Sequence, residues 1–302
     1  MEKNVWWQMK NDLMIVVDSG YIANAAKHAM KGMDLKHENI HTSIIYVFLQ
    51  QISNLIKKFK SKRFVFCWDS RTSKRLEIYP EYKANRKDKS KLTEDDLIYN
   101  NICYGQFAVI QNDVLPSIGF KNIFNQDGYE SDDIIASIVQ TNTRNQKMCI
   151  VANDHDLFQL LDDTIFLYDP KSKEKTTDRD FYDRFGIYPS YWGEVLAIAG
   201  CTTDYVKGIE NVGVKTAIKY LLGRLSRSRE THTLILSEIG QRIIERNKKL
   251  VVLPFEGTMI PSIMNDEVFY LKDFENMCEK YGFYSFLKAE RLIEWRNLLE
   301  MR

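Results

Sequence analysis

The 302-residue sequence contains few cysteines, and they lie too far apart to suggest a cross-link or a zinc site. The five cysteines are Cys67, Cys103, Cys149, Cys201 and Cys278, and no two of them form a Cys-x-x-Cys pair. An odd, scattered set argues against a disulfide framework and favours a reducing compartment. We therefore expect a protein of the cytoplasm.

Long hydrophobic runs are missing as well. No stretch approaches the roughly 18 to 20 consecutive apolar residues that span a bilayer, and the N-terminal residues lack the apolar segment of a signal peptide. The five histidines suggest no Ser–His–Asp or Cys–His pair, so a covalent nucleophile is not expected. With 44% hydrophobic residues, the chain can nevertheless bury a full core. We expect a globular protein with no membrane partner.

The sequence also lacks an excess of charge of one sign, because the net charge is only +1. The positive and negative residues are nevertheless segregated along the chain. Lys57–Lys91 holds thirteen Lys or Arg against four Asp or Glu. Asp127–Asp163 holds eight acids against two bases, and Tyr205–Arg229 holds six bases against one acid. This alternation is typical of a protein that binds a polyanion on both sides of an acidic, metal-binding centre.

Three short apolar runs predict strands buried on both faces, as in a parallel sheet. They are Leu13–Val17, Phe64–Trp68 and Met148–Ala152. Helical periodicity lies between and beyond them, at 43–60, 132–140, 234–250 and 287–299. The rhythm favours a doubly wound α/β core with a mainly helical C-terminal third. Asp18, Asp69 and Asp154 follow the three runs, at the edge of a parallel sheet where ligands bind.

A fourth acidic group, at 130–133, opens the helical pattern at 132–140. Carboxylate oxygens are the ligands that Mg²⁺ and Mn²⁺ prefer. The candidate metal ligands are Asp18, Asp69, Glu130, Asp132, Asp133, Asp154, Asp156 and Asp204. If they converge, they can hold two ions roughly 3.5 to 4 Å apart, the arrangement used for displacement at phosphorus. Two other segments suit nucleic acid: Tyr79–Lys91 interleaves aromatics with cations, and the glycine-containing turn Gly208–Gly213 precedes Lys215.

Together these motifs resemble the 5′ nuclease, or flap endonuclease, family, most closely its small stand-alone bacteriophage and bacterial members. The resemblance covers about 13–217 and continues more loosely through 246–254. The matching motifs, in the order of the family, are Val17-Asp18, Trp68-Asp69, Tyr79–Arg86, Tyr129–Asp133, Asn153–Asp156, and Asp204 with the turn Gly208–Lys215. The resemblance implies a PIN-like, resolvase-like fold with a mainly parallel sheet. It places a nuclease core at 1–204, a helical arch at about 77–112 and a helical DNA-binding region with a helix–turn–helix at 205–302.

The same resemblance implies roles for individual residues. Asp18, Asp69, Glu130 and Asp132 would hold a first metal ion, with Asp133 helping through water, and Asp154, Asp156 and Asp204 would serve a second. Lys83 and Arg86 would act at the scissile phosphate, and Tyr82 would offer a stacking face. The implied nucleic-acid contacts are Tyr82, Lys83, Arg86, Lys87, Gly208, Gly213, Lys215 and Thr216. The turn could also host a potassium ion.

Two departures from the family pattern concern the second ion. Cys201 stands where the family has a carboxylate, and sulfur is a poor partner for Mg²⁺. His155 replaces a small glycine in the acidic loop. We expect the second site to be weakened but not lost.

The leading prediction is a monomeric nuclease that cuts flapped, nicked or RNA-primed duplexes in replication, with DNA or RNA–DNA hybrid as partner. A PIN-type ribonuclease and a nucleic-acid-binding homologue with decayed catalysis are the alternatives.

Overall fold

The computed structural model describes residues 13–33, 35–70, 74–86, 92–142 and 146–300. Its centre is a six-stranded sheet with the strand order β5-β4-β1-β6-β7-β8. The strands are β1 (Met14–Asp18), β4 (Phe64–Cys67), β5 (Ile123–Phe124), β6 (Met148–Val151), β7 (Ile165–Asp169) and β8 (Glu174–Thr176). All neighbours pair in parallel except β7 and β8, which are antiparallel. The three predicted strands and the mainly parallel α/β fold are confirmed.

Both faces of the sheet are buried, which explains why its strands are continuous apolar runs. Alternate residues of β1 point to opposite sides: Val16 joins one hydrophobic core, and Ile15 and Val17 join the other. β1 lies in the middle, paired with β4 on one side and β6 on the other. The side chains that follow these three strands therefore meet at one edge of the sheet.

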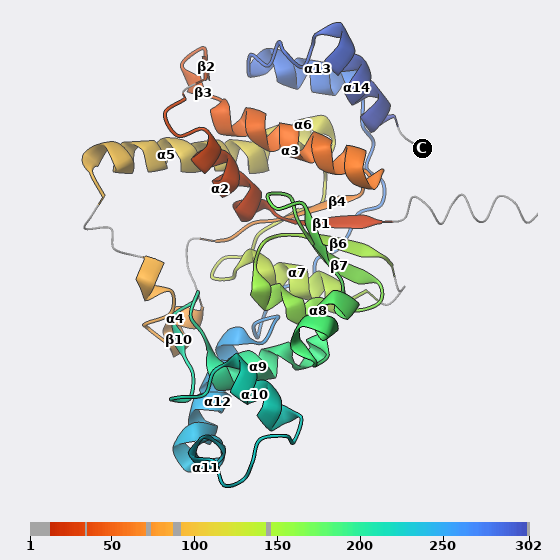
Figure 1. The fold of residues 1–302 in the computed structure, drawn as a ribbon. Coiled ribbons are helices and arrows are strands. Elements are labelled where there is room, and N and C mark those ends of the chain that lie inside the picture. The colour runs from red at the N-terminus through yellow and green to blue at the C-terminus, as the bar shows by residue number, and fades with distance from the viewer. Residues whose placement is uncertain (1–12, 34, 71–73, 87–91, 143–145, 301–302) are drawn as a thin grey trace, which may run out of the picture.

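One face is covered by helices from both ends of the chain (Figure 1). They are α2 (Ser19–Ala29), α3 (Ser43–Phe59), α5 (Glu94–Val109), α6 (Leu115–Ile118), α13 (Leu271–Lys280) and α14 (Ala289–Leu299). A π-helical segment, Ile110–Val114, joins α5 to α6, and the short strands Lys36–His37 (β2) and Ile40–His41 (β3) form a hairpin before α3. No helix within the described residues is long and apolar enough to cross a membrane.

The other face carries α7 and leads to a group of helices at the far end of the molecule (Figure 1). These elements are α7 (Ser131–Gln140), η5 (His155–Leu160), α8 (Asp178–Phe185), η6 (Pro189–Tyr191), α9 (Trp192–Ala199), α10 (Val214–Leu221), α11 (Glu230–Leu236) and α12 (Glu238–Val251). Between α9 and α10 lies a small ribbon of β9 (Gly200–Cys201) and β10 (Val206–Lys207). The helix predicted over 234–250 is divided, because the Ser237 side chain accepts a hydrogen bond from Gly240 N (3.0 Å) and starts α12.

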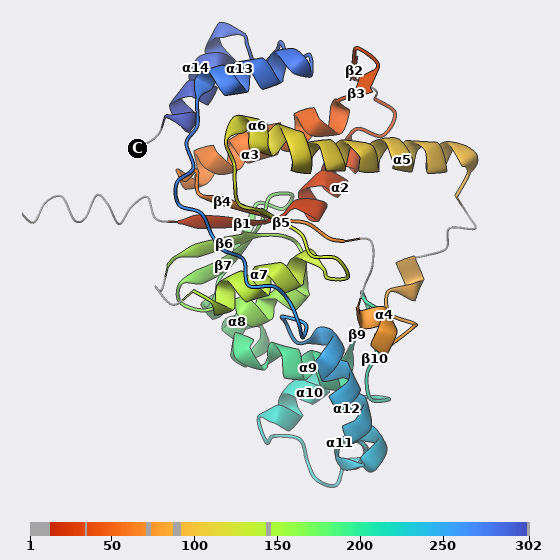
Figure 2. The same ribbon diagram turned by 180° about the vertical axis from the view of Figure 1, so that it is seen from behind.

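The structure also divides the predicted C-terminal region 205–302. Residues 252–270 run back along the molecule from α12 to α13, which Figure 2 shows from behind. Asn122 holds this segment through hydrogen bonds with the backbone N–H and C=O of Met264 (2.8 and 2.9 Å). The last helices then bury Phe274 and Trp295 in the same core as Ile15. At the helical end, α10 and α12 pack against α9, whereas α13 and α14 pack in the core on the sheet.

The segment predicted to form the arch, 77–112, contains three described helices. α4 (Arg75–Ile78) ends near its start, η2 (Ala84–Arg86) lies within it, and α5 occupies most of its second half. Thr93 starts α5 with a capping box in which Asp96 reciprocates its hydrogen bond. Lys87 lies outside the described residues.

Candidate metal centre and nucleic-acid interface

The ends of β1 and β4 bring Asp18 and Asp69 together. A Cβ built on Gly20 would lie 3.0 Å from Asp69 Oδ2 and 3.4 Å from Asp18 Oδ1, so both carboxylates border the same small space. Ser131, the first residue of α7, links them: its N–H donates to Asp69 Oδ1 (2.8 Å) and its hydroxyl to Asp18 Oδ1 (3.3 Å). The side chain of Asp18 also accepts from Tyr21 N (3.0 Å) and thereby caps α2.

Electrostatics show that further carboxylates share this space. Burial, together with the negative charges of Asp69 and Asp154, raises the pKa of Asp18 to about 7. Burial also raises the pKa of Asp132 well above its usual value, and Asp154 and Asp18 act in the same direction. Asp132 Oδ1 is buried without a hydrogen-bond partner. The four carboxylates that the sequence placed in four separate segments therefore repel one another across a common site.

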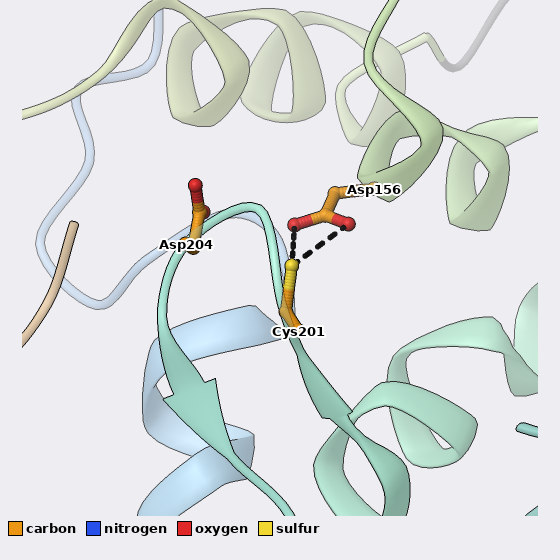
Figure 3. Close-up of side chains that lie close together, drawn as sticks. All are labelled: Asp156, Cys201 and Asp204. Carbon is orange, nitrogen blue, oxygen red and sulfur yellow. Dashed lines mark hydrogen bonds between the residues drawn. The ribbon is translucent and has the colours of Figure 1, made fainter. Parts of the chain in front are cut away.

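A second group adjoins the first. One ligand atom each from Asp156, Cys201 and Asp204 lies within 4.8 Å of the others. Figure 3 shows Cys201 pointing at Asp156, and the distances from its Sγ to the two Asp156 carboxylate oxygens are 3.5 and 3.7 Å. Burial is the main reason that the pKa of Asp156 is raised to about 7, and the negative charges of Asp154 and Asp204 contribute. Burial likewise raises the pKa of the Cys201 thiol to about 12, with Asp156 contributing.

Lys83 lies between the two groups of carboxylates. Its Nζ is 2.8 Å from Glu130 Oε1 and 3.6 Å from Asp204 Oδ1. The Lys83 backbone is held in the left-handed region (φ 54°), and its N–H donates to the carbonyl of Asp204 (2.8 Å). Such a conformation costs a residue with a side chain on the order of 1 kcal/mol and is maintained only by its surroundings. The fold therefore directs this lysine into the acidic site.

The structure corrects the role predicted for Asp133, because it does not place this side chain in the metal centre. Both of its oxygens accept hydrogen bonds from Arg75 (2.7 Å each), and Oδ1 also accepts from Phe255 N (2.9 Å). Asp133 is fully buried and reciprocates the capping box at the start of α7. Because both oxygens are engaged, Asp133 anchors α7, and Asp132 is the aspartate of this pair that faces the other carboxylates.

The prediction that Tyr82 offers a stacking face is also corrected, because this side chain is only 2% exposed. Its hydroxyl lies 3.0 Å from Glu130 Oε2 and 2.8 Å from Asp204 Oδ2. The ring has the cations of Arg75 and Lys83 near it, 5.8 and 5.1 Å from its centroid. The buried Tyr82 hydroxyl thus links the segment of Glu130 to the segment of Asp204.

Of two other residues named from the sequence, one joins no group of ligands and the other has a side chain outside the described part of the chain. His155 stacks on Phe158, with 4.7 Å between the ring centroids, and no described metal-ligating group includes it. Arg86 is the last residue of η2, and its side chain, like Lys87, lies outside the described part of the chain.

The predicted glycine turn starts at a point where two backbones touch. A Cβ on Gly208 would lie 2.1 Å from the carbonyl carbon of Ala199 and 2.4 Å from Gly200 N, so only glycine fits. Gly213 is the N-terminal cap residue of α10, and Lys215 and Thr216 lie in the first turn of that helix. Lys215 is exposed, and Thr216 is half-buried with its N–H donating to Gly213 O (2.9 Å).

Sequence reasoning missed Arg75. This arginine is 2% exposed and also donates from Nε to Leu250 O (2.7 Å), so it joins α4, α7 and the end of α12. It belongs to a lysine-rich segment, and nothing in that pattern distinguishes a buried cation from its exposed neighbours. Ser131 was likewise missed, because a serine that opens a helix is ordinary capping chemistry.

The donor set fits divalent cations. Its members are hard carboxylate oxygens, their charges repel one another, and Asp132 Oδ1 has no protein partner. A cation would relieve both the repulsion and the unmet hydrogen-bonding capacity. The single sulfur, from Cys201, is the one donor that suits Mg²⁺ poorly.

Known proteins resemble this chain in sequence and in fold. The model of the family described as 5′-3′ exonuclease, N-terminal resolvase-like domain matches residues 13–186. A 5′-3′ exonuclease of Mycoplasmopsis pulmonis is 27% identical over 276 residues, covering 87% of this chain and 86% of the relative. A 5′-3′ exonuclease of Aquifex aeolicus is 33% identical over 182 residues, covering 60% of this chain and 59% of the relative.

Among solved structures, the T5 5′-exonuclease with bound divalent zinc ions superposes with a TM-score of 0.68 at 18% identity, covering 96% of this chain and 99% of that one. Flap endonuclease-1 from Methanococcus jannaschii superposes with a TM-score of 0.54 at 13% identity, covering 96% and 93%. These two likenesses concern the fold. Since the family model spans more than half of the sequence, the chain belongs to the 5′-3′ exonuclease family with its resolvase-like N-terminal domain, which confirms the nuclease predicted from the motifs.

Proposed function

We propose that this protein is a structure-selective 5′ nuclease that hydrolyses phosphodiester bonds in flapped, nicked or RNA-primed duplexes, using two divalent metal ions. The observation that carries the proposal is that Asp18 and Asp69 border one small space at the carboxyl edge of the parallel sheet, where the charges of Asp132 and Asp154 also act. Removal of flaps or RNA primers during replication is the matching cellular role, carried out by a cytoplasmic monomer.

The two groups of carboxylates divide the ligands between two ions. Asp18, Asp69, Glu130 and Asp132 would hold the first ion, and Asp154, Asp156 and Asp204 the second. When bound, Mg²⁺ or Mn²⁺ ions would activate a water molecule and stabilise the negative charge that develops on the phosphate. Cys201 would weaken the second site toward Mg²⁺, because a neutral thiol beside Asp156 replaces a charged oxygen ligand.

Lys83 would meet the scissile phosphate. Its ammonium group lies within reach of both ligand groups, at Glu130 and at Asp204, and can turn from them to an incoming phosphate oxygen. A cation held there by the protein offsets charge that grows in the transition state. Arg86 and Lys87 follow on the same segment and would extend the contact along the 5′ strand.

The helix–turn–helix would bind the duplex part of the substrate. The backbone N–H groups of Gly213 and Lys215, the Lys215 ammonium and the Thr216 hydroxyl lie at the start of α10, where the helix dipole favours phosphate. The turn from Gly208 to Gly213 could also hold a potassium ion between its backbone and the DNA.

The test is cleavage of a labelled 5′-flap duplex with and without Mn²⁺ or Mg²⁺, with product sizing to locate the cut. Asp132→Asn should abolish cleavage while leaving salt-dependent duplex binding intact. Asp163→Asn is the matched control, since Asp163 is an exposed aspartate at the opposite edge of the sheet. Cleavage that survives both Asp69→Asn and Asp132→Asn would remove the carboxylate mechanism.

The same assay separates the alternatives. A protein with decayed catalysis would bind the flap duplex and give no product with either metal ion. A PIN-type ribonuclease would cut labelled single-stranded RNA in preference to the flap duplex.

A further inference from the structure

A groove of about 500 Å³ lies at the helical end of the molecule, between the end of α8, α10 and the loop that leads to α11. Five cations line it, and no carboxylate is among its lining residues. The cations are Arg184, Lys215, Lys219, Arg224 and Arg229. All five are exposed. Two of them, Arg184 and Arg229, lie outside the helix–turn–helix and come from segments about forty-five positions apart in the sequence.

These cations have no ionic partner within the described part of the chain. The nearest carboxylate in sequence to Arg184 is Asp183, which pairs instead with Arg179 at 3.9 Å. Arg184 itself lies over the ring of Phe185, 4.9 Å from its centroid. Elsewhere on this protein exposed lysines do find acids, as Lys248 does with Glu194 at 3.6 Å. Five unpaired like charges around one concave surface create a positive potential that attracts a polyanion.

The groove is a built surface with defined positions for its charges. The backbone N–H groups of Arg224 and Leu225 both donate to Lys219 O (2.7 and 3.0 Å), which closes the end of α10. The N–H of Arg229 donates to Ser226 O (3.1 Å), so the loop is a hydrogen-bonded turn that presents its arginines. Leu225 is buried beneath them. Ser226 also lines the groove, and a hydrogen bond between its hydroxyl and that of Ser228 (2.9 Å) ties the loop further.

We propose that this groove binds the phosphodiester backbone of duplex DNA beyond the helix–turn–helix. Lys215 makes the surface continuous, because it lies in the first turn of α10 and also lines the groove. A duplex engaged at the turn would therefore reach Lys219, Arg224 and Arg229 as it extends. The groove thus reads the length of the duplex arm and not its sequence, since phosphate contacts position nucleic acid without specifying bases. This inference rests on the proposed nuclease function.

The test measures binding in the Asp132→Asn background, so that no substrate is cut. The probes are flap duplexes whose duplex arm is about half, one or two helical turns long, about 5, 10 or 20 base pairs. The groove variant is Arg224→Gln with Arg229→Gln. Arg179→Gln is the matched control, because Arg179 is an exposed cation of α8 that already pairs with Asp183 and does not line the groove.

We expect the groove variant to bind the longest arm more weakly than the parent does and to bind the shortest arm as the parent does. Each lost phosphate contact lowers the slope of log affinity against log salt by about 0.9, so the variant should lose about 2 from the slope on the longest arm. The control should retain the parent slope on every arm.

An unchanged slope on the longest arm would overturn the proposal and leave the groove to an acidic protein partner. An equal loss on all three arms would also overturn it, because the groove would then not lie beyond the turn. The result is independent of catalysis. If the unsubstituted protein fails to cut any flap but the arm-length effect is present, the nuclease function fails and the groove stands.

Discussion

Two neighbouring aspartates, Asp132 and Asp133, should respond in opposite ways to the same isosteric change. Each is replaced by asparagine, which keeps the shape of the side chain and removes its charge. The structure assigns Asp133 to the anchor of α7 and Asp132 to the metal centre. Stability and metal binding should therefore separate cleanly between the two variants.

The cost of Asp133→Asn follows from what the carboxylate contacts. Arg75 donates two hydrogen bonds of 2.7 Å to it, and both side chains are almost completely buried. Removing one partner of a buried ion pair leaves an uncompensated charge and costs about 3–5 kcal/mol. At about 2 °C per kcal/mol for a chain of this size, the Tm should fall by about 6–10 °C. The metal centre should keep its affinity, because no proposed ligand is altered.

Asp132→Asn should have the reverse effect. Burial and the charges of Asp154 and Asp18 raise the pKa of Asp132, so its ionised form is repelled in the metal-free protein. Removing that charge should leave the metal-free Tm unchanged or higher at about pH 8. The increase in Tm that Mn²⁺ produces should be lost, because binding to the native state is what generates it.

The assay is thermal unfolding of both variants and the parent, with and without Mn²⁺. Arg75→Met in combination with Asp133→Asn serves as the control for the ion pair, and it should recover part of the lost stability. The reasoning is refuted if Asp133→Asn keeps the parent Tm but loses the Mn²⁺ effect. That result would make Asp133 a ligand and Arg75 incidental.

Three further outcomes are expected. Cys201→Asp should lower the Mg²⁺ concentration needed for cleavage severalfold, and identical metal titrations would contradict this. The pKa values of Asp18 and Asp156 are raised from 3.8 to about 7, so their contribution to metal-free stability is complete below about pH 4 and is lost as pH rises through 7. The metal-free Tm should therefore be higher at about pH 6 than at about pH 8. The increase in Tm that Mn²⁺ produces should be smaller at about pH 6, because protons compete for the ligands. Thermal unfolding at both pH values, with and without Mn²⁺, checks this. Gly208→Ala should cost about 1–3 kcal/mol, because its Cβ would overlap Ala199, and an unchanged urea midpoint would show that the turn adjusts freely.

Much of the centre could be predicted from local patterns. An apolar run that stops at an aspartate predicts both a buried strand and a carboxylate at its end, and parallel pairing brings such ends to one edge. Asp18, Asp69 and Asp154 obey that rule. Asp133 did not follow the family motif in the expected way, because adjacent positions at a helix start point in different directions, and Tyr82 did not because its ring is buried. Which of two neighbouring acids meets the other carboxylates depends on where Arg75 is buried, and nothing local marks that arginine.

The sequence by itself determined the three central strands, the acidic clusters and the family, because these depend on periodicity and on short motifs. Only the tertiary structure decided that Asp133 pairs with Arg75, that Cys201 points at Asp156, and that residues 252–270 return to the core before α13. It also decided that Arg184 and Arg229 share a groove. The physical reason is the same in each case. Pairing and burial depend on which surfaces meet after the chain has folded, and residues distant in sequence contribute the two halves of each contact.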